Sequence, residues 1–119
     1  MLERRYAHSC HVGVFEAQEG IYVAGGLDVS LDVPFFSSAE FYNPQLDIWE
    51  EISSLTTQRF FASMTMLGGD LIVSGGLPGW TSVEAWNGST WVELDDQRLE
   101  IGRAFHAAVS VKAGILSCV

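Results

Sequence analysis

The feature of this sequence that most constrains its fold is an internal repeat. Three segments start at an arginine and continue in a similar way: RYAHSC from Arg5, RFFASM from Arg59 and RAFHAA from Arg103. The last two arginines are 44 residues apart, and so are Glu40 in SSAEFYN and Glu84 in TSVEAWN. Independent markers that recur in one order indicate tandem structural units.

A double glycine follows a β-rich run in both units, Gly25 and Gly26 after IYVA and Gly75 and Gly76 after LIVS. A phosphate-binding loop would require a helix after the glycines, with free N–H groups aimed at the anion. The segments that follow, LDVSLDVPFF and LPGWTS, match neither GxGxxG nor GxxxxGKS/T. We therefore interpret the glycines as strand ends where the chain turns sharply, and we expect no cofactor.

Each unit is predicted to form four short antiparallel strands. Runs of β-branched residues alternate with turn residues, and no segment of ten or more residues has a convincing helical period. The predicted fold class is therefore all-β. The expected strands cover residues 9–15, 21–24, 39–42 and a segment around Trp49 in the first unit, and residues 62–67, 71–74, 83–86 and a segment around Trp91 in the second.

The turn between the third and fourth strands carries an aromatic pair in each unit. Trp86 and Trp91 flank an Asn-Gly turn, and Tyr42 and Trp49 flank a loop that is two residues longer. Because side chains alternate between the two faces of a strand, two added residues preserve the face of the flanking side chains. Both pairs are expected on the same sheet face, where each aromatic would contribute about 1.5–3 kcal/mol by packing a neighbouring unit.

These markers resemble the kelch repeat, in which a double glycine is followed by two spaced aromatics and a four-stranded blade takes about 50 residues. Trp86 stands where a tyrosine is usual. The resemblance implies blades of a β-propeller around a central channel. It also implies a mostly non-enzymatic, protein-binding role, often in substrate recognition by a cullin-type ubiquitin ligase or in actin association. We assign residues 1–58 and 59–102 to two blades and residues 103–119 to the first strands of a third.

Because propellers typically have 4–8 blades, two blades predict an incomplete, open ring. The double glycine expected near Val119 is absent, which predicts a fragment of a longer protein or a truncated product without independent function. Open blade edges would promote self-association. A further alternative is a kelch-fold oxidase or sugar-isomerising enzyme, which would require Tyr, His and Cys ligands converging near the channel.

Candidate chemistry is sparse. His8, Cys10 and His11 form an H-x-C-H cluster, but on a strand His8 and Cys10 share one face while His11 points to the other. We therefore predict no metal site and, for the same reason, no Cys–His nucleophile and no catalytic residue. Cys10 and Cys118 are expected to be free, partly buried thiols.

The loops after the double glycines are the candidate partner-binding sites, because propellers present partners to the loops at one rim. Exposed aromatics beside acids would suit a basic or amphipathic peptide, or the aromatics would fold back over the blade edges. The recurring arginines would either line this rim or tie neighbouring blades together through Glu40 and Glu84, and we favour the tie. The candidate binding residues are Asp28, Asp32, Phe35, Phe36, Pro78 and Trp80.

Charge and hydropathy exclude several partner classes. The formal charge of −9, from 15 acidic and 6 basic residues, would repel a polyanion, so nucleic acid and anionic membranes are not expected partners. No stretch approaches the roughly 20 apolar residues of a membrane span, and the N-terminal residues lack the apolar core of a signal peptide. The resulting expectation is a cytoplasmic protein that binds another protein or peptide.

Overall fold

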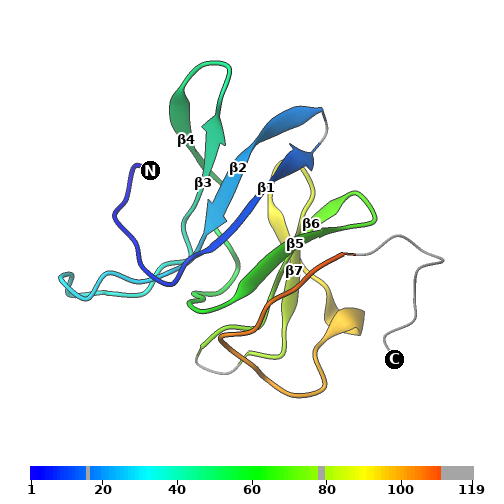
Figure 1. Cartoon of the computed structure of the whole chain (residues 1–119). Helices are drawn as coiled ribbons and strands as arrows, with labels where there is room; N and C mark the ends of the chain where they lie inside the picture. The colour runs from blue at the N-terminus through cyan, green and yellow to red at the C-terminus, as the bar shows by residue number, and fades with distance from the viewer. Residues whose placement is uncertain (16, 78–79, 111–119) are drawn as a thin grey trace.

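The computed structural model describes residues 1–15, 17–77 and 80–110, and it shows two four-stranded antiparallel sheets side by side (Figure 1). We call them blade 1 and blade 2. Helical structure within the described residues is one 3-10 turn, Asp95–Gln97, so the predicted all-β class is confirmed, and the sheets do not close into a ring. Blade 1 contains β1 (Ser9–Phe15), β2 (Gln18–Ala24), β3 (Ala39–Asn43) and β4 (Ile48–Ile52); blade 2 contains β5 (Ser63–Leu67), β6 (Asp70–Ser74), β7 (Val83–Trp86) and β8 (Trp91–Glu93).

The strand register pairs Tyr42 with Trp49 and Trp86 with Trp91, as the loop lengths predicted. Their ring centroids are 5.2 Å and 5.5 Å apart, so the two pairs have nearly the same geometry. Their burial differs, because Trp86 and Trp91 are 6% and 4% exposed whereas Tyr42 and Trp49 are half-buried. Blade 1 covers this face of blade 2, and no described residue covers the equivalent face of blade 1 to the same extent.

The hydrophobic core lies between the two blades. Tyr22 and Phe41 of blade 1 have ring centroids 4.7 Å apart and belong to the same buried cluster as Leu71 and Trp86 of blade 2. At about 1.5–3 kcal/mol for each large buried side chain, this cluster supplies much of the attraction between the blades. The buried cluster consists of Phe15, Tyr22, Ala24, Ala39, Phe41, Leu55, Met64, Leu71, Val73, Trp86 and Trp91.

The first strand of blade 1 presents one face to solvent. Along β1, Cys10, Val12 and Val14 are exposed, while the alternate residues His11 and Gly13 are half-buried. The expectation that Cys10 would be partly buried was therefore wrong, because strand alternation places its side chain on the uncovered face. The Cys10 thiol is free, as expected, and Cys118 lies outside the described residues. In the described part of the chain, no helix has the length and hydropathy needed to cross a membrane.

Candidate partner-binding surface

The double glycines bring consecutive units into backbone contact. Gly25 and Gly26 have φ of 67° and 101°, a region that favours glycine, and the Gly26 N–H donates to the carbonyl oxygen of Arg59 at 2.7 Å. A Cβ on Gly25 would lie 2.2 Å from that same oxygen. In the next unit, the Gly76 N–H donates to the Arg103 carbonyl at 2.8 Å. The glycines therefore admit the backbone of the following unit, in addition to ending the strand.

A second backbone contact joins the units two residues after each recurring arginine. Ala7, Phe61 and Phe105 all have positive φ, of 54°, 54° and 56°, although none is glycine. The Phe61 N–H donates to the Ala7 carbonyl at 2.8 Å, and the Phe105 N–H donates to the Phe61 carbonyl at 2.9 Å. This repeated conformation fixes where the side chains of Phe61 and Phe105 emerge.

The side chains of Arg5 and Arg59 are buried and pair with glutamate. Arg59 is 1% exposed and donates to the Glu84 carboxylate at 2.8 Å and 3.0 Å, while Arg5 donates to Glu40 at 2.8 Å. Arg59 also donates to the Gly75 carbonyl of its own blade at 2.8 Å. The expected tie between neighbouring blades takes a different form, because each arginine pairs with the glutamate of its own unit. The Glu84 carboxylate then reaches the preceding unit, where it accepts a hydrogen bond from the Thr56 N–H at 2.7 Å.

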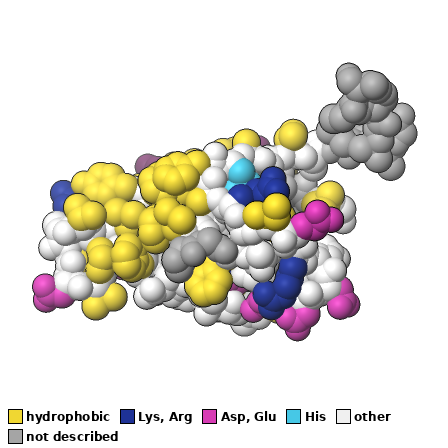
Figure 2. Space-filling view, turned by 90° about the horizontal axis from the view of Figure 1, so that it is seen from below, with side chains coloured by type: hydrophobic (Ala, Val, Ile, Leu, Met, Phe, Trp, Pro, Cys, Tyr) yellow, Lys and Arg dark blue, Asp and Glu magenta, His cyan; other side chains and the backbone are white. Residues whose placement is uncertain are grey.

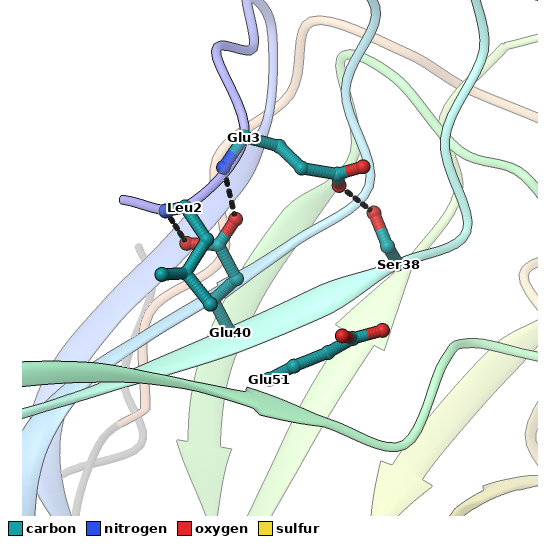
Figure 3. Close-up of a pocket in the computed structure, with 5 residues that line it drawn as sticks. All are labelled: Leu2, Glu3, Ser38, Glu40 and Glu51. Carbon is teal, nitrogen blue, oxygen red and sulfur yellow. Dashed lines mark hydrogen bonds between the residues drawn. The ribbon is translucent and has the colours of Figure 1, made fainter.

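Glu40 also anchors the segment before β1 (Figure 3). Its carboxylate accepts hydrogen bonds from the backbone N–H groups of Leu2 at 2.7 Å and Glu3 at 3.0 Å. Burial alone would raise the pKa of Glu40, but the hydrogen bonds from Glu3, Leu2 and Arg5 outweigh it and hold that pKa below its usual value. The small pocket of about 70 Å³ at this place is lined by Leu2, Glu3, Ser38, Glu40 and Glu51.

The acids of the β2–β3 loop have different surroundings. Asp28 is 5% exposed and accepts hydrogen bonds from Arg4 at 3.2 Å and from the N–H and hydroxyl of Ser30 at 2.9 Å and 2.7 Å. These hydrogen bonds from Arg4 and Ser30 lower the pKa of Asp28 to about 2. Asp28 therefore stabilises the loop, whereas Asp32 in the same loop is exposed and available to a partner.

Four phenylalanines form a continuous row, which we call the aromatic row: Phe35, Phe60, Phe61 and Phe105. Phe35 stacks on Phe60 with a centroid distance of 5.0 Å and an interplanar angle of 5°. Phe60 contacts Phe61 at 5.8 Å, and Phe61 stacks on Phe105 at 3.8 Å. The row joins the β2–β3 loop to the starts of the second and third arginine segments. Of its members, sequence reasoning identified Phe35 alone; the signal for the others was their position one or two residues after a recurring arginine.

The aromatic row borders a group of exposed aliphatic side chains on the β2–β3 loop. Val29, Leu31 and Val33 are largely exposed, and Phe35 is 42% exposed. Figure 2, which shows the molecule from the side of these loops, has hydrophobic side chains gathered over one half of the face. We call these three aliphatic residues the loop tip. Such an extended apolar surface is typical of interaction sites rather than of ordinary solvated loops.

The remaining candidate residues point inward or lie outside the described part. Phe36 is half-buried beneath the Arg5 guanidinium, at 5.3 Å from the ring centroid. Trp80 is half-buried and donates its indole N–H to the Gln58 carbonyl at 3.1 Å. Pro78 lies outside the described residues. The structure thus brings Asp32 and Phe35 to the surface and uses Asp28, Phe36 and Trp80 in contacts within the chain.

Comparison with known proteins agrees with these repeats. The kelch motif family model matches residues 4–56, which contain all of blade 1. Kelch-like protein 11 of Homo sapiens and of Mus musculus are each 35% identical to this chain over 71 residues, or 56% of it. The chain spans about a tenth of these relatives' length, 10% and 9% respectively. The resemblance to the kelch motif seen in the sequence is confirmed over residues 4–56.

Proposed function

We propose that this kelch segment binds a protein partner through the aromatic row and the loop tip. The observation that carries the proposal is the exposure of Phe35 and the three aliphatic side chains beside it, next to a row of stacked rings. Aromatic side chains that are already fixed by stacking lose little conformational entropy on binding, so they serve as energetic anchors. Kelch repeats support the broader role of a protein-interaction segment.

The chemistry of the partner follows from the surface. An amphipathic peptide would cover the aliphatic loop tip with its apolar side, and the formal charge of −9 favours basic groups on its other side. No catalytic step is proposed. In a longer protein, this segment would belong to the substrate-recognition part of a cullin-type ubiquitin ligase or to an actin-associated protein in the cytoplasm, as the kelch resemblance implies.

The division of the chain into residues 1–58, 59–102 and 103–119 is part of the same proposal. Its support is the repeated contact in which a double glycine donates to the carbonyl of the next unit's arginine. Arg103 is the third recurring arginine and the second to accept this contact, which makes residues from 103 onward the natural start of a further unit.

Site-specific crosslinking tests the proposed binding surface. A photoreactive phenylalanine analogue would replace Phe35, and a matched control would carry it at Leu46, an exposed apolar residue in the β3–β4 turn at the far end of blade 1. We expect one partner to crosslink at position 35 and not at 46, and Phe35→Ser to weaken its measured affinity at least about tenfold, in the range of an aromatic anchor. Equal crosslinking at both positions, or unchanged affinity in Phe35→Ser, would contradict the proposal.

Self-association is a second candidate, favoured by one observation. Val12 is 67% exposed and lies on the side of blade 1 that bears the half-buried Tyr42 and Trp49, whereas the equivalent aromatic pair in blade 2 is covered. Another copy of the chain would bury this face. Light scattering at increasing concentration tests it: Val12→Lys is expected to shift the mass toward the monomer, and a monomer at all concentrations would exclude it.

A further inference from the structure

A histidine contact joins the third arginine segment to blade 2. Two backbone hydrogen bonds hold residues 103–106 against this blade (Figure 1). In addition, the Ser74 hydroxyl oxygen and Nε2 of His106 are 3.2 Å apart, within hydrogen-bonding distance. A Cβ on Gly75 would lie 2.7 Å from Cε1 of the same ring, so the imidazole lies directly on the double glycine. The ring is therefore part of the junction between blade 2 and the segment that follows.

The junction between blades 1 and 2 has alanine at both of the equivalent positions. Ser74 and Ala24 are each the last residue of the second strand of their blade, and His106 and Ala62 each stand three residues after a recurring arginine. Ala24 belongs to the buried hydrophobic cluster, and Ala62 packs against it. The chain thus repeats the backbone contacts of the first junction in the second one, but it replaces an apolar pair by a polar pair with a titratable ring.

His106 is half-buried, and its second ring nitrogen is buried without a partner. Among the described residues, none forms a hydrogen bond with Nδ1. A protonated imidazole carries N–H groups on both nitrogens, so protonation would place a charged donor in this site without an acceptor. Burial and, after it, the nearby Arg103 guanidinium lower the pKa of His106. The docked segment therefore favours the neutral ring.

The charged groups around the ring provide no partner for a protonated His106. Arg103 lies on the same segment and would repel it. On β6, Asp70 is at the opposite end of the strand from the histidine contact, about 13 Å away. Glu84 on β7 and Glu93 on β8 are each paired with an arginine, and β5 contains no charged residue. In the described part of the chain, no carboxylate forms an ion pair with this ring.

We propose that the Ser74–His106 contact is a pH-sensitive switch, which holds residues 103–106 on blade 2 while the ring is neutral and releases them when it is protonated. The released segment binds the proton more readily than the docked one, so docking is strongest above the usual histidine pKa of 6.5 and weakens as the pH falls below it. Release would carry Phe105 away from Phe61 and remove one ring from the aromatic row. Its effect on partner binding rests on the proposed function, whereas the release itself is a property of the chain alone.

Fluorine NMR on the full chain, with 4-fluorophenylalanine in place of Phe105, tests the switch. The ring lies 3.8 Å from Phe61 in the docked state, so its shift separates docked from released segments. We expect the ratio of docked to released segments to fall at least about threefold between pH 7.5 and pH 5.0. The ring protons of His106 in the unsubstituted chain report its pKa directly, which is expected below the usual value. A constant ratio, or a pKa at or above the usual value, would overturn the proposal.

Histidine variants assign the response to this one ring. His106→Gln keeps a polar group beside Ser74 but does not titrate, and the double variant Ser74→Ala/His106→Ala reproduces the alanine pair of the first junction. We expect the docked ratio of both to be independent of pH. His8→Gln is the matched control, because His8 is the equivalent residue of the first unit and also has an unpartnered, buried Nδ1. An unchanged pH response in either His106 variant, or its loss in His8→Gln, would contradict the proposal.

Discussion

Replacing Arg59 by methionine is expected to lower the free energy of unfolding by about 3–5 kcal/mol, the usual cost of breaking a buried ion pair from one side. The guanidinium makes hydrogen bonds to the Glu84 carboxylate, the Gly75 carbonyl, and the carbonyl and hydroxyl of Ser82. Methionine fills most of the same volume, so the cavity term is small. The main loss is a carboxylate that is 0% exposed and has no cation to neutralise it.

Urea unfolding followed by tryptophan fluorescence measures this effect. For a slope of about 2 kcal/mol per molar urea, the midpoint would fall by roughly 2 M. Arg98→Met is the control, because the Arg98–Glu93 pair is partly exposed and its loss should cost under about 1 kcal/mol. The double variant Arg59→Met/Glu84→Leu should regain much of the stability, because it removes the unpaired charge. If Arg59→Met cost no more than Arg98→Met, or the double variant regained nothing, the reasoning would be refuted.

Three further predictions concern glycine geometry, burial and pH. Gly25→Ala should lower the free energy of unfolding by well over 2 kcal/mol, because the new Cβ would meet a carbonyl oxygen at 2.2 Å. Gly68 has a similar φ but open space around it, so Gly68→Ala should lower it by about 1–2 kcal/mol. The midpoints of urea unfolding of the two variants compare these losses. Trp91→Ala should lower the free energy of unfolding by about 3–5 kcal/mol, and Trp49→Ala should lower it clearly less, because Trp91 is buried and Trp49 is half-buried. Equal losses measured by calorimetry would contradict the conclusion that blade 1 covers the Trp91 face of blade 2. Because the pKa of Asp28 falls from 3.8 to about 2 on folding, its stabilisation is complete above pH 3.8 and is lost as the pH falls toward 2. Asp28→Asn should therefore flatten this part of a stability–pH profile, and an unchanged acid limb would argue against the Asp28–Arg4 contact.

The fold class and the strand register could be predicted because both depend on local, periodic information. Strand alternation and loop parity were enough to place Tyr42 opposite Trp49 and Trp86 opposite Trp91. The partners of the arginines were not predictable in this way. Arg59 and Glu84 are 25 residues apart in sequence, and a repeat interval does not reveal whether two recurring residues meet within one unit or between two.

The candidate surface was predicted only in part, because its contacts cross three units. Phe35 was identifiable from its loop, but its stacking on Phe60 depends on how blade 2 is placed against blade 1. The inward positions of Asp28 and Trp80 depend on Arg4 and on the Gln58 carbonyl, neither of which the loop sequence names.

The backbone hydrogen bonds between units hold each junction from both sides. Gly26 and Gly76 each donate to a carbonyl of the unit that follows, and Phe61 and Phe105 each donate to a carbonyl of the unit before. In a chain of nearest-neighbour couplings, the weaker junction opens first. The Arg59 side chain is buried and paired with Glu84, whereas the Arg103 side chain is exposed. Opening should therefore begin at the Gly76–Arg103 contact and spread toward the N-terminus, leaving Gly26 protected longest.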